Sequence, residues 1–152
     1  MSKLKDQINA DLKEAMLARD EFRTTTLRGL KAAILNEEVA KGVRETGLDD
    51  AAVEQLIVKE AKKRVEAAEL FDKGGNADSA QKERDEKALL DAYLPEQLSE
   101  EQVKVLVDKA IAEIQPEGMK DMGRVIGAVK ATAGNSADGA LVARLVKEAL
   151  GQ

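Results

Sequence analysis

The sequence predicts an all-α protein built from two helical modules, and three observations support this. Apolar residues recur at helical spacing along most of the chain. No run of β-branched residues alternates with a period of two, so no segment is a strand candidate. Pro95 separates a long region rich in Lys and Glu from shorter segments divided by glycines. We therefore expect an N-terminal long-helix bundle over residues 1–94 and a small three-helix module over residues 95–152.

The first two expected helices cover about residues 3–19 and 22–41. Ser2 is placed to cap the first helix, and Gly42 is placed to end the second. The residues expected to face the core share the three- and four-residue spacing of a helical stripe. They are Leu4, Ile8, Leu12, Ala15 and Met16 in the first helix, and Leu27, Leu30, Ile34 and Leu35 in the second.

The third and fourth expected helices form the rest of the bundle. Asp49 or Asp50 can cap the third helix, which should end at Gly74-Gly75. Its predicted inner face comprises Val53, Ile57, Ala61, Ala68 and Phe71. The fourth helix covers about residues 78–93, and its first half is almost entirely polar. We expect that half to project into solvent or to extend past its partner helix.

Pro95 marks the start of the small module, because proline cannot continue a helix and pushes its predecessor out of the α region. Ser99 and Gln102 have the spacing of a capping box, and Leu98 and Val103 that of a hydrophobic staple. Three apolar stripes follow, each typical of a short helix. They run through Val103–Ile114, Met122–Val129 and Leu141–Ala149.

Composition excludes several classes of function. The 152 residues include no Cys and no His, which excludes thiolate zinc sites, disulfides and Cys or His nucleophiles. Neither a P-loop nor a dinucleotide-binding glycine motif is present. Aromatic residues are 2% of the chain, too few for a base-stacking surface. We therefore expect no catalytic residue, no metal and no cofactor.

The composition and charge of the chain predict its location in the cell. The chain has 35% charged residues, a net charge of −5, no apolar stretch long enough to span a bilayer and no apolar leader pattern at its start. From these features we predict a cytoplasmic protein without a membrane partner.

The sixth expected helix carries the strongest candidate binding surface. Met122, Val125, Ile126 and Val129 lie on one side at 100° per residue. The opposite side combines small residues with cations and comprises Lys120, Gly123, Arg124, Gly127, Lys130 and Ala131. Two interpretations stay open. A nucleic-acid backbone can approach this flat side with the cations on its phosphates, or another helix packs against the glycines while the cations stay solvated.

Three further patterns carry weaker signals. The exposed side of the second helix is expected to carry Arg23, Thr24, Arg28 and Lys31, either in ion pairs with Glu residues of neighbouring helices or as a secondary RNA contact. The segment 134–139 is a turn before the last helix, or an anion site at its start that Asp138 would oppose. Acidic pairs such as Glu37-Glu38 are expected to be helix-terminal or solvated charges and not metal or acid–base sites.

The chain resembles the bacterial YqeY family over essentially its whole length. The resemblance is carried by Tyr93-Leu94-Pro95-Glu96-Gln97-Leu98-Ser99, by Lys120-Asp121-Met122-Gly123-Arg124-Val125-Ile126-Gly127 and by Ala137-Asp138-Gly139. Upstream, Leu27-Arg28 and Lys31-Ala32-Ala33-Ile34 also match. Ile126 stands where the family pattern has Met, and Asn135-Ser136 is a variant linker.

The resemblance implies a two-module helical fold related to the tail of GatB, a subunit of the tRNA-dependent amidotransferase. It points to a tRNA-associated binding module, an accessory to a carbon–nitrogen ligase system that uses glutamine as amido-N-donor. The chain itself lacks an amidase nucleophile of the Ser-Ser-Lys type and a nucleotide motif, so we expect it to be non-catalytic. The alternative is a helical protein–protein interaction adaptor with no RNA ligand.

Overall fold

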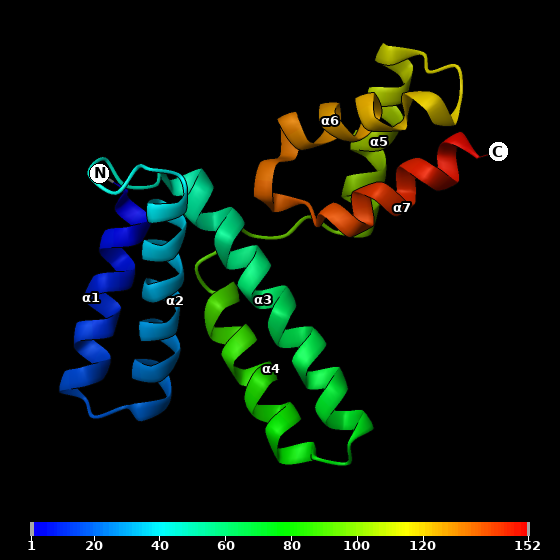
Figure 1. Ribbon diagram of the computed structural model, residues 1–152. Coiled ribbons are helices and arrows are strands. Elements are labelled where there is room, and N and C mark those ends of the chain that lie inside the picture. Colours follow the sequence, from blue (N-terminus) through cyan, green and yellow to red (C-terminus); the bar gives the residue numbers. More distant parts are fainter. Residues whose placement is uncertain (1, 152) are drawn as a thin grey trace. The chain divides into compact units, whose positions relative to one another are not determined.

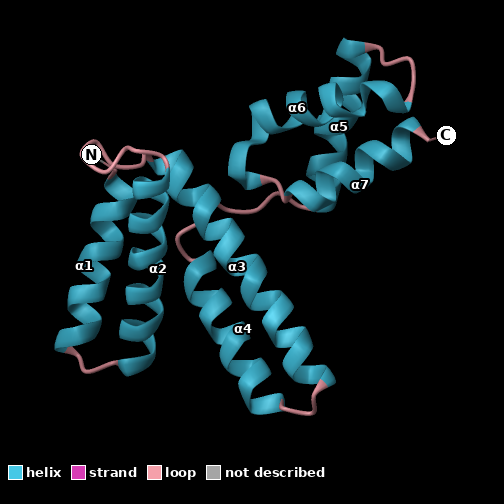
Figure 2. Cartoon of the chain, viewed as in Figure 1, coloured by secondary structure: helices cyan, strands magenta, loops and turns pink. Residues whose placement is uncertain are grey.

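The computed structural model describes residues 2–151, which are helical wherever they are regular (Figure 1, Figure 2). The predicted all-α class is confirmed, since no strand occurs among these residues. The helices are α1 (Lys3–Leu17), α2 (Glu21–Ala40), α3 (Asp50–Lys73), α4 (Ala77–Asp91), α5 (Glu100–Ile114), α6 (Met122–Ala133) and α7 (Gly139–Leu150). Two short 3-10 turns, η1 (Met119–Asp121) and η2 (Gly134–Ser136), flank α6.

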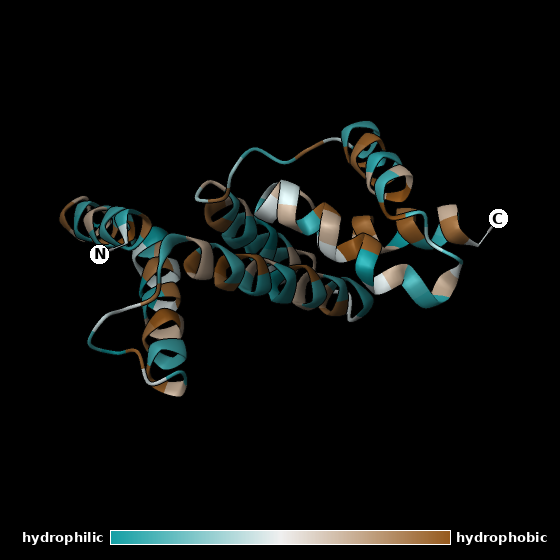
Figure 3. Cartoon of the chain, turned by 90° about the horizontal axis from the view of Figure 1, so that it is seen from above, coloured by the Kyte–Doolittle hydropathy of each residue, from teal (hydrophilic) through white to brown (hydrophobic). Residues whose placement is uncertain are grey.

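The chain divides into two compact units, Met1–Leu94 and Pro95–Gln152. The unit boundary falls at the proline, where Leu94 ends one unit and Pro95 begins the next. Figure 3 shows hydrophilic and hydrophobic residues alternating around the helices, as amphipathic sequences require. Whether each unit folds as an independent domain stays a prediction.

The first unit consists of two helical hairpins, α1 with α2 and α3 with α4 (Figure 1). Side-chain caps start all four helices, and Ser2 and Asp49 provide two of them as predicted. Gly42 follows the end of α2 with φ +68°, the left-handed conformation that favours glycine. The core is aliphatic and comprises Ile8, Leu12, Leu27, Leu30, Ile34, Leu48, Val53, Leu56, Ile57 and Leu90.

Three residues predicted to face this core are exposed instead. The exposed fractions are 49% for Met16, 43% for Leu35 and 37% for Phe71. Met16 and Phe71 lie in the last turns of α1 and α3, beyond the part of each helix that meets the core. Leu35 lies on α2, but its side chain is not among those that form the core. Periodicity identifies the apolar side of a helix, whereas the length and width of the contact depend on the neighbouring helices.

The polar half of α4 does not project away from its partner, which corrects the prediction. It lies alongside α3, and Ala80 within it is fully buried. Arg64 of α3 lies 3.4 Å from the carboxylate of Glu86 and 3.9 Å from that of Glu83. Burial, with repulsion from Glu83, raises the pKa of Glu86 above its ordinary value. Ion pairs between α3 and α4 thus accompany the small buried alanines at this end of the hairpin.

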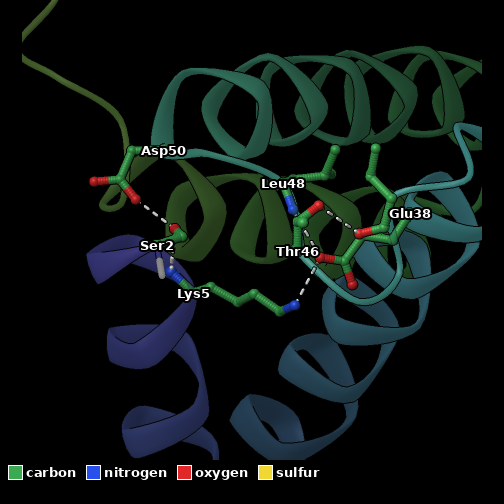
Figure 4. Close-up of polar contacts among 7 residues, drawn as sticks. Ser2, Lys5, Glu38, Thr46, Leu48 and Asp50 are labelled. Carbon is green, nitrogen blue, oxygen red and sulfur yellow. Dashed lines mark hydrogen bonds and ion pairs between the residues drawn. The ribbon is translucent and has the colours of Figure 1, made fainter.

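Glu38 lies in the last turn of α2, a helix-terminal position as expected, but its side chain is buried and not solvated. Only 2% of Glu38 is exposed. Its Oε2 accepts hydrogen bonds from Lys5 Nζ at 2.7 Å and from the backbone N–H of Leu48 at 2.9 Å (Figure 4). These two donors hold the pKa of Glu38 below its ordinary value, against the opposing effect of burial.

A second carboxylate joins the same end of the first unit. Asp50 accepts hydrogen bonds from the Ser2 hydroxyl and, at 3.1 Å, from the backbone N–H of Leu4 (Figure 4). The hydrogen bond from Ser2 contributes most to a lowered pKa of Asp50. The start of α1 is therefore attached by Asp50 to the start of α3 and, through Lys5 and Glu38, to the end of α2.

The second unit packs α5, α6 and α7 around a smaller aliphatic core. The predicted capping box is confirmed: Ser99 Oγ accepts from Gln102 N at 3.2 Å, and Gln102 Oε1 accepts from Ser99 N at 2.9 Å. Leu98 packs against the core and donates its N–H to the Ser136 carbonyl at 2.8 Å. The buried core residues are Val103, Val107, Ala110, Val125, Val129, Ala137, Val142, Leu145 and Val146.

Candidate nucleic-acid interface

The outward side of α6 is small and cationic, as the sequence indicated. Val125 and Val129 are 0% and 1% exposed and point into the second unit's core. Gly123, Arg124, Gly127 and Lys130 are all exposed. Because residues three and four apart share one side of a helix, these four form a continuous surface, which we call the α6 face.

The two glycines of the α6 face have open space in front of them. A Cβ atom built on Gly123 or on Gly127 would have no heavy atom within 4 Å beyond its own helix backbone. No described part of the second unit therefore packs against these glycines. Of the two interpretations left open by the sequence, packing by another helix of the second unit is excluded among its described residues.

Lys120 lies next to the α6 face and not on α6 itself, which corrects its predicted position. It belongs to the 3-10 turn η1, because the α-helix begins only at Met122. Its ammonium is paired with Glu117 at 2.5 Å, and both side chains are at least 70% exposed. An ion pair between two such exposed groups is worth at most about 1 kcal/mol, so Lys120 can exchange its partner readily.

Arg124 also has a local acidic partner. Its guanidinium lies 3.4 Å from Asp121, while 67% of the Arg124 side chain stays exposed. The backbone N–H of Glu117 also donates to Asp121, at 2.9 Å. These donors, the backbone N–H first, hold the pKa of Asp121 below its ordinary value. Asp121 therefore stays ionised at neutral pH and partly neutralises Arg124.

Lys130 extends from α6 over the start of α7. Its Nζ lies 3.7 Å from the position that a Cβ of Gly139 would occupy. Asp138 caps α7 by accepting from the N–H of Ala140 at 3.1 Å. This cap supports the turn interpretation of residues 134–139, because the helix start already has an anionic side chain of its own.

The secondary candidates on α2 do not form one exposed strip. Arg23 is half-buried, and its guanidinium is 4.0 Å from Glu14 of α1. Arg28 is exposed and points a guanidinium nitrogen at the sulfur of Met16, 3.9 Å away. Lys31 is exposed as well. Of the two alternatives left open, ion pairing with Glu describes Arg23 alone among these three.

Other kinds of site find little support among the described residues. No group of three or more carboxylates within residues 2–151 is placed to hold a metal ion. No described helix is long and apolar enough to cross a membrane. Two open hollows lie at loops, one beside Gln115–Gly118 and one beside Gly42–Thr46.

The chain matches the sequence model of a known family over residues 5–150, and the description of that family is "Yqey-like protein". This match covers nearly all of the chain. It confirms the family resemblance inferred from the motifs around Pro95 and α6.

Individual relatives carry the name "Altered inheritance of mitochondria protein 41, mitochondrial". The protein from Eremothecium gossypii is 39% identical over 87 residues, which cover 57% of the chain and 46% of the relative. That from Lachancea thermotolerans is 31% identical over 71% of the chain and 58% of its own length. That from Pyrenophora tritici-repentis is 28% identical over 95% and 80%, respectively. The chain spans about half the length of the first two relatives.

These names contradict the predicted cytoplasmic location, because the relatives are named as mitochondrial proteins. The prediction was based on composition and charge, which determine how a chain interacts with water. A protein surface meets water in every aqueous compartment of the cell, so composition does not distinguish one such compartment from another.

Proposed function

The chain belongs to the YqeY family, and from this premise we propose that it is a non-catalytic tRNA-binding module that contacts RNA through the α6 face. The family's resemblance to the GatB tail suggests the ligand. We further propose that the module is an accessory to a tRNA-dependent amidotransferase, a carbon–nitrogen ligase system with glutamine as amido-N-donor. The chain would contribute binding, since it carries neither Cys nor His for nucleophilic chemistry.

The observation that carries this proposal is the open space in front of Gly123 and Gly127. A glycine inside a helix costs about 1 kcal/mol relative to alanine. Close packing within the second unit does not account for that cost, because nothing described in that unit approaches either residue. A ligand backbone coming close to the helix would account for it. Lys120, Arg124 and Lys130 border the same surface and supply charge for phosphates.

The net charge of the chain determines how tightly we expect it to bind tRNA. A net charge of −5 opposes general attraction of a polyanion, and Glu117 and Asp121 compete for two of the three cations. We therefore expect binding that is modest and steeply dependent on salt. Such binding suits an accessory module that acts together with a larger partner.

The test is filter binding of the full chain to tRNA at low and at moderate salt. Replacing Lys120, Arg124 and Lys130 with Ala should weaken binding and lower the slope of log affinity against log salt by roughly 2 to 3 units. The matched control replaces Lys104, Lys109 and Lys147, which are exposed on other helices of the same unit. Both variants change the net charge equally, so only the position of the lost charges differs.

A steric variant tests the same surface without changing charge. Gly127→Leu should fold normally, because the space in front of the glycine is open, yet it should hold an RNA backbone away from the helix. The proposal fails if both the triple Ala variant and Gly127→Leu bind tRNA as the parent does.

The second candidate is a protein–protein adaptor with no RNA ligand. The acidic balance of the chain and the exposed aliphatic side chains of α2, Leu35 and Val39, favour it. An absence of tRNA binding at every salt concentration would make the adaptor the preferred function.

A further inference from the structure

Three carboxylates share one guanidinium where α3 and α4 lie side by side (Figure 1). Arg64 Nη2 lies 4.0 Å from Glu60, and Arg64 Nη1 lies 3.9 Å from Glu83. Arg64 Nε lies 3.4 Å from Glu86. A guanidinium that serves a single carboxylate commonly makes two parallel hydrogen bonds of about 2.7–2.9 Å. Arg64 is therefore divided among its three partners and engages none of them closely.

Two atoms of this Arg64 cluster, which comprises Glu60, Arg64, Glu83 and Glu86, are buried and have no hydrogen-bond partner among the described residues. They are Arg64 Nε and Glu83 Oε2. The side chains of Glu83 and Glu86 are 19% and 14% exposed, so water covers little of either. A buried acceptor without a donor is costly. The carboxylates themselves supply no donor while they are ionised, because an ionised carboxylate only accepts.

The charges of the Arg64 cluster do not balance. Glu60 has a further cation, Lys63, at 3.2 Å. Three carboxylates thus meet two cations, which leaves one negative charge in excess. Lys82 is exposed on α4 and attracts Glu86 less than Arg64 does. The other two cations of α4 have carboxylate partners elsewhere: Arg84 pairs with Asp72, and Lys87 pairs with Asp91.

We propose that Glu83 and Glu86 share one proton, so that mild acid strengthens the contact between α3 and α4. The shared proton removes the excess negative charge. It also turns one carboxylate into a donor, which can bond an oxygen of the other. Two carboxylates at one site do not readily ionise together, because each repels the charge on the other. Glu60 needs no such proton, since Lys63 donates a hydrogen bond to it.

The titration of Glu86 agrees with this arrangement. Burial, followed by repulsion from Glu83, raises the pKa of Glu86 above its ordinary value of 4.5, against the attraction of Arg64. A hydrogen bond to Glu83 raises this pKa further. The raised pKa and the excess charge have one cause, because a guanidinium divided among three carboxylates does not fully neutralise any of them.

The effect of pH on this contact has a definite sign. The folded pair holds its proton more tightly than the unfolded chain does. Its stabilisation is therefore complete below pH 4.5 and is lost as the pH rises through the folded-state pKa of the pair. Glu38, Asp50 and Asp121 have lowered pKa values and act in the opposite direction, chiefly below pH 4.5. The range above pH 4.5 thus reports on the pair.

The inference is independent of the proposed function. Its residues lie on α3 and α4 of the first unit, whereas the proposed RNA contact lies on α6 of the second. Failure of either proposal leaves the other unchanged.

Carbon-13 NMR of the glutamate carboxyls in the full chain tests the shared proton directly. Glu83 and Glu86 should both respond to two titration steps, one above pH 4.5 and one below it, because coupled carboxyls release their protons as a pair. Glu86→Gln should abolish the upper step at Glu83. Glu69→Gln is the matched control and should leave both steps in place, because Glu69 is exposed on α3 of the same hairpin.

Two results of this titration would overturn the inference. One is a single step at each of the two carboxyls, at or below pH 4.5. The other is an upper step that persists at Glu83 in Glu86→Gln, since Glu83 would then hold a proton without help from its neighbour.

Urea unfolding measures what the shared proton contributes to stability. As the pH falls from 7 to 4.5, the parent should gain stability relative to Glu86→Gln, and Glu69→Gln should follow the parent. The gain is about tenfold in the unfolding equilibrium constant for each unit by which the folded-state pKa is raised. Glutamine keeps the size of glutamate and can donate to Glu83, so the variant is expected to fold. A parent that gains no stability relative to Glu86→Gln over this range would also overturn the inference.

Discussion

Glu37 and Glu38 show how adjacent residues of one type acquire different roles. Glu37 pairs with Lys41 one turn later at 3.2 Å and stays part-exposed. Glu38 is rotated by 100°, toward the core, where Lys5 and the backbone N–H of Leu48 meet its carboxylate. An ionised group in that position must be paired, because an isolated buried charge is costly. Both donors come from segments outside α2.

At the residue scale, we expect Glu38→Gln to destabilise the protein by about 1–2 kcal/mol at pH 7. The reason is the loss of a charge-assisted hydrogen bond, discounted because Lys5 is 31% exposed. Glu37→Gln is the control and should cost at most about 0.5 kcal/mol. Urea unfolding followed by circular dichroism measures both. Equal effects of the two substitutions would contradict the structural role of Glu38.

The pH dependence of this effect has a definite sign. The folded-state pKa of Glu38 lies below its ordinary value of 4.5, so its contribution is complete above pH 4.5 and is lost as the pH falls through the folded-state pKa. The difference in unfolding free energy between parent and Glu38→Gln should therefore shrink on acidification. A difference that grows as the pH falls would show that another group dominates.

At the scale of elements, α5 and α6 begin in different ways: side chains cap the start of α5, whereas α6 follows a 3-10 turn. Ser99 and Gln102 satisfy the first backbone N–H groups of α5 reciprocally. No side chain caps α6, which follows directly from η1. Lys120 therefore lies in a 3-10 turn, where the sequence pattern alone placed it on the helix.

Ser99→Ala should destabilise the second unit by about 1 kcal/mol, because it removes the acceptor for the Gln102 N–H. Ser99→Asp should retain most of the stability, since aspartate caps a helix equally well. Thermal unfolding of the full chain and its two variants measures both effects. If alanine and aspartate behave alike, the capping box contributes little to the stability of α5.

At the scale of the whole molecule, the two units have separate aliphatic cores. The first core gathers residues from four helices and the loop residue Leu48, whereas the second is built largely from valine and alanine. A segment of about 60 residues buries only about 60% of its chain surface, so the second unit is expected to be the less stable one.

We predict that residues 1–94 and 95–152 fold when expressed separately. Each fragment should show helical circular dichroism and cooperative unfolding, the second at lower temperature. If residues 95–152 were unfolded alone but stable within the full chain, the units would form one cooperative domain, and the predicted two-domain organisation would be wrong.

By itself, the sequence determined the helices and the character of the α6 face. Apolar spacing predicted most of the helical segments, and Pro95, Ser99 and Gly42 marked ends and starts because their effects on the backbone are local. It also predicted which side of α6 is buried, since a helix has one fixed period.

Only the tertiary structure decided which polar groups meet and which apolar groups stay uncovered. Glu38 meets Lys5, Arg64 meets Glu86, and Leu35 remains exposed. The open space in front of Gly123 and Gly127 became evident in the same way. Each of these features depends on residues distant in the chain, or on the absence of a neighbour. The apolar periodicity of a single helix predicts neither.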